Sequence, residues 1–268
     1  MQQLLSTIQR ITSQNREQPF AAYSSVHQQR LLNVPIAKPL LIVVLSGNKA
    51  FGKNNEVICD SGDFVFFADS PAINMRNIPT DQPYMSLIIE FDFDDFNGLQ
   101  FTTAKKQDYC LGKASNALTH CLQQFVESTQ WAPKSMWSLR KREILTLLNH
   151  LGYSDILALL GKAKVSHRLH DMFHHHQFAE LSIDSICDQL AMSESTLRRR
   201  LKSEGTSVQE VKDQARLGLG LHLLQTTAYS IAVIAEKCGY QSPSRFTERF
   251  KGRFDLTPSE LRKTKLMD

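Results

Sequence analysis

The residues with the clearest capacity for chemistry lie in the segment GYQSPSRFTERFKGRFDLTP, near the end of the chain. Arg245, Arg249 and Arg253 recur every four residues, a spacing that places them along one side of a helix. Phe246 and Phe250 have the same spacing on an adjacent face and can anchor that helix to a core. A planar guanidinium forms paired hydrogen bonds with a phosphate or with the edge of guanine. The segment therefore predicts either a helix that binds nucleic acid or an ordinary solvated cationic helix.

A second cationic segment, LRRRLK at residues 197–202, belongs to an internal repeat. The stretch SIDSICDQLAMSESTLRRRLK begins at Ser182, and SIAVIAEKCGYQSPSRFTERFK begins at Ser230. Their apolar and cationic positions coincide once one residue is inserted in the second stretch. A single cationic run is most often a solvated helix face, but two matching runs in matching places favour a shared binding role.

Each copy of the repeat indicates two helices joined by a tight turn. In the first copy Ser193 can cap the second helix, and in the second copy Gly239 permits the turn before a cap at Ser242 or Ser244. This is the pattern of a helix-turn-helix motif, whose second helix enters the DNA major groove with its N-terminal part against the bases. The cationic side chains of both copies would then face DNA.

The segment TSVQEVKDQARLGLGLHLLQTT, residues 206–227, predicts one helix that joins the two copies and is capped by Ser207. It would set the distance between the two DNA-reading helices, which should be about one turn of the duplex, roughly 34 Å. Gly218 and Gly220 each cost about 1 kcal/mol inside a helix relative to alanine. They indicate either close packing or slight flexibility.

The part from about residue 18 to residue 92 predicts β structure. Runs such as PLLIVVLS, FVFF and YMSLIIEFD are separated by turn residues at near-regular spacing, which is typical of a small barrel or sandwich. Phe64 and Phe66 would either line a pocket in it or fill its interior. Three helical segments follow, namely SNALTHCLQQFVESTQ, SMWSLRKREILTLLNHLG and YSDILALLGKAK. They either cover the β domain or form an oligomer surface.

Composition limits the class of protein. The formal net charge of +4 and the pI of about 8.8 are only mildly basic, so bulk charge does not prove a nucleic-acid partner. Five cysteines without a CxxC motif indicate reduced thiols and a cytosolic protein. No apolar run is long enough for a membrane span, and the first residues do not resemble a signal peptide.

No constellation of residues predicts an enzyme or a cofactor. His27 is the only histidine of the β region, which argues against a metal site there. The segment SHRLHDMFHHHQ aligns His167, His170 and His174 on one helical face, and we interpret them as surface histidines rather than metal ligands. Cys187 takes an inward helix-turn-helix position and is expected to pack rather than to sense redox state, and the same expectation holds for Cys238.

The residues from about 165 to 265 resemble the DNA-binding domain of the AraC/XylS family of bacterial transcription regulators. The most specific part is IAVIAEKCGYQSPSRFTERFKGRFDLTPSELRK, with its Ile-Ala pair, Gly-Tyr, Ser-Arg-Phe and Thr-Pro-Ser. The pattern LLIVVLSGNKAF is similar to the cupin-like sensing barrel of many members. The resemblance implies an α+β chain with a cupin-like sensing and dimerisation domain at 1–160 and a DNA-binding domain with two helix-turn-helix motifs at 161–268.

Carried over by position, the resemblance implies base contacts from Ser195, Arg198, Arg199, Ser244, Arg245 and Glu248. It implies phosphate contacts from Thr196, Lys202, Arg249 and Lys251. It also implies a non-enzymatic cytoplasmic homodimer, joined through helices at 113–130 and 136–151, that binds double-stranded promoter DNA. The expected role is that of an activator, with RNA polymerase as a further partner and a small-molecule or protein effector acting on the N-terminal domain. The alternative function is effector capture, with DNA contact secondary.

Overall fold

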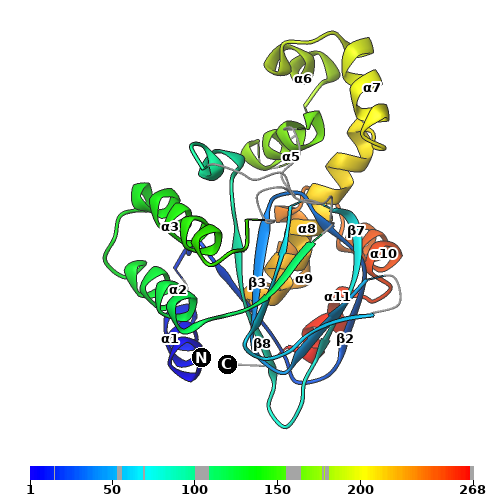
Figure 1. The fold of residues 1–268 in the computed structure, drawn as a ribbon. Helices are drawn as coiled ribbons and strands as arrows, with labels where there is room; N and C mark the ends of the chain where they lie inside the picture. Colours follow the sequence, from blue (N-terminus) through cyan, green and yellow to red (C-terminus); the bar gives the residue numbers. More distant parts are fainter. Residues whose placement is uncertain are drawn as a thin grey trace.

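The structure is a computed structural model, and it describes residues 1–14, 16–52, 56–68, 70–99, 109–154, 164–176, 178 and 181–265. After an N-terminal helix at Gln2–Thr12, strands occupy the chain up to residue 113, and helices occupy the part that follows (Figure 1). This order confirms the predicted arrangement of an N-terminal β domain and a C-terminal helical domain. No helix among the described residues has the length and apolar character needed to cross a bilayer.

The described strands form two antiparallel sheets. The first has the order β1-β8-β3-β6-β9, with the bounds β1 Ala21–Ser25, β8 Tyr84–Glu90, β3 Leu40–Ser46, β6 Asp63–Phe67 and β9 Tyr109–Lys113. The second has the order β2-β7-β4-β5, with the bounds β2 Gln29–Ile36, β7 Ser70–Ile78, β4 Asn48–Phe51 and β5 Val57–Cys59.

No strand pairing among the described residues closes these two sheets into one barrel, so the cupin-like barrel is not confirmed. The chain passes from the first sheet to the second at Gly47, between β3 and β4. Gly47 has a φ of +70°, and a Cβ there would lie 2.6 Å from the carbonyl oxygen of Ile78. Only glycine accepts both that backbone conformation and that close approach.

The wholly apolar run of β3 is explained by burial on both of its faces. Leu41 and Val43 pack under the helices α1 Gln2–Thr12, α2 Asn116–Ser128 and α3 Trp137–His150. Ile42 and Val44 point the other way, into an apolar core that includes residues of the second sheet. A strand alternates its side chains between two faces, and here neither face meets water.

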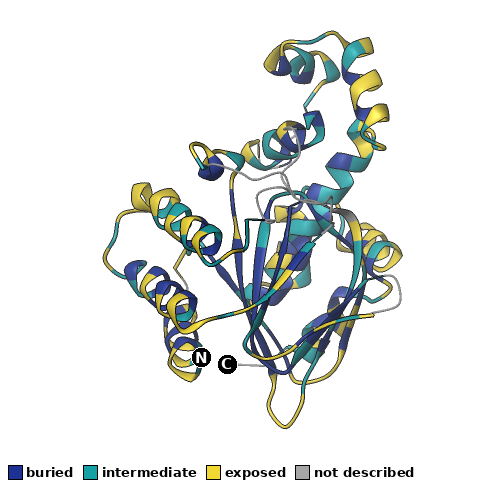
Figure 2. Ribbon diagram, viewed as in Figure 1, coloured by how far each residue is buried: buried dark blue, intermediate teal, exposed yellow. Residues whose placement is uncertain are grey.

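The helices α1 to α3 therefore cover one face of the first sheet and keep their outer faces exposed (Figure 2). Phe64 and Phe66 belong to this same core and are completely buried, so they fill space beneath the helices. Short 3-10 turns lie at Phe93–Phe96 and Lys134–Met136. The third predicted helical segment, YSDILALLGKAK, lies for the most part outside the described residues.

Seven further helices are described in the C-terminal part: α5 Val165–His175, α6 Ile183–Leu190, α7 Glu194–Ser203, α8 Val208–Thr226, α9 Ile231–Lys237, α10 Pro243–Phe254 and α11 Pro258–Thr264. In Figure 1, α6 and α7 project away from the strands, whereas α8 to α11 lie beside them. Helix α10 contacts β2, and α8 contacts both β1 and β2. One continuous apolar core joins strand residues such as Val34 with Phe250 and Leu261. The sequence did not predict this shared core.

Candidate nucleic-acid interface

The first helix-turn-helix unit consists of α6, a tight turn and α7. Ala191 closes α6 in the left-handed conformation with a φ of 53°. Ser193 accepts the backbone N–H of Thr196 at 3.3 Å, which confirms the predicted cap of α7. Leu197 and Leu201 are buried between α7 and its neighbours. The second helix of the unit is therefore held by its apolar side and free on the other.

The predicted contact residues of α7 lie on its outer side. Ser195, Arg198, Arg199 and Lys202 are exposed, and Thr196 is half-buried. Arg198 forms an ion pair with Glu194 at 2.6 Å, one helical turn away. An exposed pair of this kind contributes only about 0–1 kcal/mol, so a phosphate or base can replace Glu194 at little cost.

The second unit consists of α9, a turn at Gly239 and α10. Gly239 has a φ of +74°, and a Cβ added at this position would lie 2.8 Å from the Cβ of Phe178, so the turn requires glycine. Ser242 accepts the backbone N–H of Arg245 at 3.3 Å, so Ser242 rather than Ser244 caps α10. Phe246 and Phe250 have no exposed surface, which confirms their predicted anchoring role.

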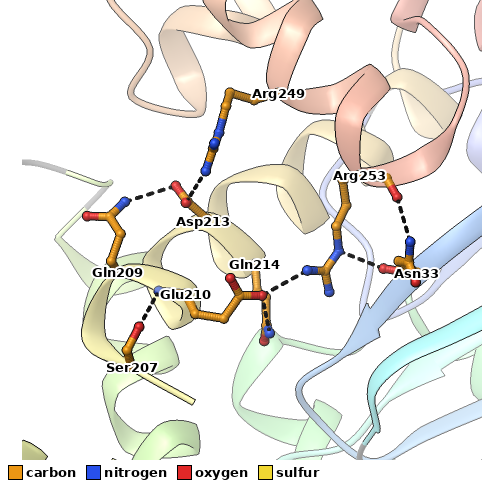
Figure 3. Close-up of polar contacts among 8 residues, drawn as sticks. All are labelled: Asn33, Ser207, Gln209, Glu210, Asp213, Gln214, Arg249 and Arg253. Atoms are coloured by element: carbon orange, nitrogen blue, oxygen red, sulfur yellow. Dashed lines mark hydrogen bonds and ion pairs between the residues drawn. The ribbon is translucent and has the colours of Figure 1, made fainter. Parts of the chain in front are cut away.

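The outer side of α10 carries the other predicted contact residues, and Ser244, Arg245, Glu248, Arg249 and Lys251 are all exposed. The guanidinium of Arg249 pairs with Asp213 of the joining helix α8 (Figure 3). The Asp213 side chain is mostly covered, whereas Arg249 is half exposed. Arg249 must exchange this carboxylate for a phosphate if it is to contact DNA.

Arg253 does not share the outward face of Arg245, so this part of the sequence prediction is wrong. Its Nε donates to the carbonyl oxygen of Asn33 at 2.7 Å, and its Nη1 donates to Glu210 at 2.9 Å (Figure 3). Asn33 Nδ2 in turn donates to the carbonyl oxygen of Arg253 at 3.3 Å. Each four-residue step advances about 40° around a helix, so two steps turn Arg253 about 80° toward the strands.

The two glycines of α8 differ in their surroundings. A Cβ at Gly220 would lie 2.7 Å from the ring of Phe246, whereas a Cβ at Gly218 would meet nothing closer than Pro35 at 3.8 Å. Of the two explanations left open by the sequence, close packing accounts for Gly220. Nothing in the packing requires glycine at position 218.

His167, His170 and His174 of α5 were predicted to be surface residues, but His167 is buried and the other two are partly buried. The His167 ring is buried and stacks on Phe93 with 4.6 Å between ring centroids. Burial, together with the charge of His170, lowers the pKa of His174 to about 3. Among the described residues, no three His, Cys, Asp or Glu side chains are arranged to hold a metal ion. Cys238 is buried as predicted, and burial raises its pKa to about 12, whereas Cys187 is only partly buried.

A cavity of about 360 Å³ lies between the strand domain and the helices α5 and α8. Both sheets contribute apolar side chains to its wall, among them Leu31, Ile42 and Met75, and α8 contributes Leu221. The volume falls in the range of small-molecule sites. Sequence reasoning missed this cavity because its lining residues come from eight separate elements with no common motif.

Comparison with known proteins finds matches to the C-terminal part of the chain. The model of a family described as a helix-turn-helix domain matches residues 186–264. The urease operon transcriptional activator of Escherichia coli is 35% identical over 80 residues, which cover 30% of this chain and 27% of that protein. The transcriptional regulator SirC of Salmonella typhimurium is 35% identical over 79 residues, again 30% of this chain and 27% of that protein. This chain thus aligns with less than a third of the length of these curated relatives.

Solved structures extend the likeness to the whole fold. The apo form of a ToxT variant from Vibrio cholerae matches with a TM-score of 0.67, over 94% of this chain and 100% of that chain, at 16% identity. ToxT from the same organism with a bound unsaturated fatty acid matches with a TM-score of 0.65, over 93% of this chain and 98% of that one, at 15% identity. These matches show a shared two-domain fold. The similar proteins with curated names are transcription regulators, in agreement with the prediction that the chain is not an enzyme.

Proposed function

The chain is a member of the AraC/XylS family through its C-terminal domain, and from that premise we propose that it is a sequence-specific DNA-binding transcription regulator. Residues 161–268 would bind promoter DNA, and residues 1–160 would form a cupin-like sensing and dimerisation domain. The proposal places the protein in the bacterial cytoplasm as an activator that also contacts RNA polymerase.

The observation that carries the proposal is the pair of matching helix-turn-helix units. Both units bury the apolar side of their second helix and expose arginine on the other side. We assign base contacts to Ser195, Arg198 and Arg199 in the first unit and to Ser244, Arg245 and Glu248 in the second. Arg245 is suited to guanine, and Glu248 can accept a hydrogen bond from cytosine. Phosphate contacts are assigned to Thr196, Lys202, Arg249 and Lys251.

The first test is selection of bound sites from random duplex DNA by the full-length protein at two salt concentrations. Two short boxes about one helical turn apart are expected, with affinity that falls steeply as salt rises. Arg199→Ala and Arg245→Ala should each weaken binding by about 1–3 kcal/mol and relax the preference for one base. Arg200→Ala is the matched control, because Arg200 is exposed on the same helix but lies outside the assigned contacts. Unchanged affinity and preference in Arg245→Ala would remove that assignment.

The effector is proposed to be a small molecule that occupies the cavity of about 360 Å³. Two structures of ToxT from Vibrio cholerae, each similar in fold to this chain, hold an unsaturated fatty acid and a naphthalenyl butenoic acid respectively. The cavity has contacts with both the strand domain and α8, so an occupant can influence the helical domain. Binding of small molecules with no selected DNA site would instead favour effector capture as the main function.

The homodimer is proposed to form through α2 and α3. Trp131 and Leu139 near these helices are 70% and 57% exposed, which is unusual for large apolar side chains. Leu139→Asp should convert a dimer to a monomer in light scattering after size-exclusion chromatography. A monomeric wild-type chain at micromolar concentration would contradict this part of the proposal.

A further inference from the structure

Three polar side chains stand in a row across the second sheet. Gln29 of β2 lies directly opposite Asn77 of β7, and Asn77 lies directly opposite Lys49 of β4. Directly paired residues of neighbouring strands project from the same face of a sheet. All three are almost completely buried, at 1%, 1% and 3% exposure. We call Lys49, Asn77 and Gln29 the polar ladder.

The hydrogen bonds of the polar ladder run in one direction. Lys49 Nζ donates to Asn77 Oδ1 at 2.8 Å, and Asn77 Nδ2 donates to Gln29 Oε1 at 2.9 Å. Gln29 Nε2 then donates to Thr264 Oγ1 at 2.8 Å, at the end of α11. Gln225 of α8 donates to the same oxygen of Gln29 at 3.1 Å. The polar ladder therefore connects a buried cation to two helices that pack around the second helix-turn-helix unit.

The charge of Lys49 is not neutralised within the described residues. Asn77 provides its one hydrogen-bond acceptor there, and no described carboxylate pairs with it. Cys59 lies opposite Lys49 on β5, but burial raises the pKa of its thiol to about 12, so the thiol stays neutral. The Tyr84 ring lies 5.7 Å from the ammonium. A buried charge is costly unless a partner compensates it.

Lys49 and Asn77 both line the cavity, where the surrounding wall is largely apolar. The other lysine of the wall, Lys38, is already paired with Asp92 at 2.8 Å and with Asp171 at 3.0 Å. Glu90 also lines the cavity, but it belongs to β8 of the first sheet. Its carboxylate interacts electrostatically with Tyr23 of the neighbouring strand β1. The unneutralised cation at Lys49 is thus the favourable place for an anionic group.

We propose that Lys49 anchors an amphipathic monoanion, with its carboxylate at the ammonium and its apolar chain in the cavity, and that the polar ladder transmits this occupancy to α8 and α11. A cation at the head of a chain of hydrogen bonds polarises every bond that follows. A bound carboxylate reduces that polarisation and so changes the strength of the hydrogen bonds that Gln29 forms with Gln225 and Thr264. The regulatory part rests on the proposed function, whereas the anchoring of the anion does not.

The anchor is tested by calorimetric titration of the full-length protein with decanoate, with decanol as the uncharged match. Decanoate should bind at least tenfold more tightly than decanol. Lys49→Met should weaken decanoate binding at least tenfold, whereas Lys38→Met should stay within threefold of wild type. Equal affinity of Lys49→Met and wild type, or of decanol and decanoate, overturns the anchor.

A wild-type measurement covers the case in which Lys49→Met does not fold. Burial lowers the pKa of free Lys49 to about 8, and a bound carboxylate raises it again. Between pH 8 and pH 10, decanoate binding should therefore be accompanied by net proton uptake, measured by titration in two buffers of different ionisation enthalpy. Proton uptake near zero overturns the assignment of Lys49.

The transmission is tested by hydrogen–deuterium exchange of α11 with and without saturating decanoate. Decanoate should change the exchange rate of α11 amides at least fivefold in wild type, and Thr264→Val and Gln29→Met should each abolish the change while decanoate affinity stays within threefold. Thr226→Val is the control, because its hydroxyl donates only to His222 of its own helix at 2.8 Å. An unchanged α11 in wild type with bound decanoate overturns the transmission.

DNA affinity separates this inference from the proposed function. Saturating decanoate should change the dissociation constant for the selected duplex at least fivefold, and the duplex should change that of decanoate by the same factor. If exchange in α11 changes with decanoate but no duplex is ever selected, the proposed function is wrong and the transmission through the polar ladder is supported. If a duplex is selected and bound decanoate does not change the affinity of the protein for that duplex, the transmission is wrong and the proposed DNA-binding function is supported.

Discussion

The two helix-turn-helix units share one motif but differ in what surrounds them. The core of the first unit, with Leu169, Leu197 and Val211, is a separate cluster that, among the residues the structure describes, includes none from a strand. The core of the second unit, with Phe246, Phe250 and Phe254, continues into the β sheets. Figure 1 shows the same difference, since α6 and α7 project outward whereas α10 lies against the strands. A repeat in sequence therefore does not imply equal mechanical freedom, because the second unit shares its core with the strands and the first does not.

The largest expected effect comes from truncating the core that the second unit shares with the strands. Phe250 is completely buried, so Phe250→Ala should cost about 3–5 kcal/mol of unfolding free energy. Hydrogen exchange should accelerate in β2 as well as in α10. Leu201→Ala is the counterpart in the first unit, where faster exchange should remain confined to α5, α6, α7 and the first part of α8. Equal disturbance of β2 by both variants would break the contrast between the two units.

The pH dependence of stability tests a second feature of this side of the molecule, because the buried Lys49 lies in the sheet that packs against the second unit. Burial lowers its pKa from 10.5 to about 8, so the unfolded chain binds the proton more tightly than the folded chain. The resulting loss of stability is full below pH 8 and disappears as the pH rises above 10.5. The stability of Lys49→Met relative to wild type should therefore fall by roughly 2–3 kcal/mol between pH 7 and pH 10. Urea titrations at both pH values measure this difference, and a constant difference would contradict the burial of a charged Lys49.

The glycines of α8 test the packing where the joining helix meets the second unit. Gly220→Ala forces a Cβ against the Phe246 ring and should destabilise the protein by about 1–3 kcal/mol. Gly218→Ala has room and should stabilise the helix by about 0.5–1 kcal/mol. Thermal unfolding of the two variants should shift in opposite directions. A higher unfolding temperature for Gly220→Ala than for wild type would contradict the packing explanation of Gly220.

A comparably small effect is expected in the first unit. The Glu204 carboxylate accepts the backbone N–H groups of Val165 and Ser166 at 2.8 and 2.9 Å and so caps α5. Burial opposes ionisation of Glu204, but a hydrogen bond with the Ser166 side chain and these two backbone hydrogen bonds outweigh it and lower its pKa. The cap contributes stability above the ordinary carboxyl pKa and loses it as the pH falls through the lowered value. Glu204→Gln should cost about 1 kcal/mol at pH 7, seen as faster exchange in α5 alone. An equal increase of the hydrogen-exchange rate in β2 would contradict the claim that the first unit is stabilised independently of the strands.

The sequence predicted the elements that depend on local patterns. The caps Ser193 and Ser207, the turn at Gly239 and the buried faces of Phe246 and Phe250 follow from spacing and residue type, and all are confirmed. Their positions are set by interactions between residues close in the chain. Such interactions leave a periodic signal that can be detected without the fold.

Features that depend on distant contacts were not predictable. Gln29 and Asn77 are ordinary polar residues in their own segments, and only strand pairing brings them together with Lys49. Arg253 follows the spacing of the exposed arginines, yet Asn33, far away in the chain, determines where it points. The predicted barrel is not confirmed for a related reason, since strand spacing does not reveal whether two sheets are joined into a closed barrel.

Helix α8 contributes to the cores of both units, with Ala215 in the first and Leu221 and Leu224 in the second. Its 19 residues make a rod about 28 Å long. If the end near Thr226 stays fixed on the sheets, a tilt of about 10° moves the other end by about 5 Å. That displacement exceeds the rise of one base step, about 3.4 Å. An angular change too small to disturb the strands is therefore enough to shift the first unit out of register with its half of a DNA site.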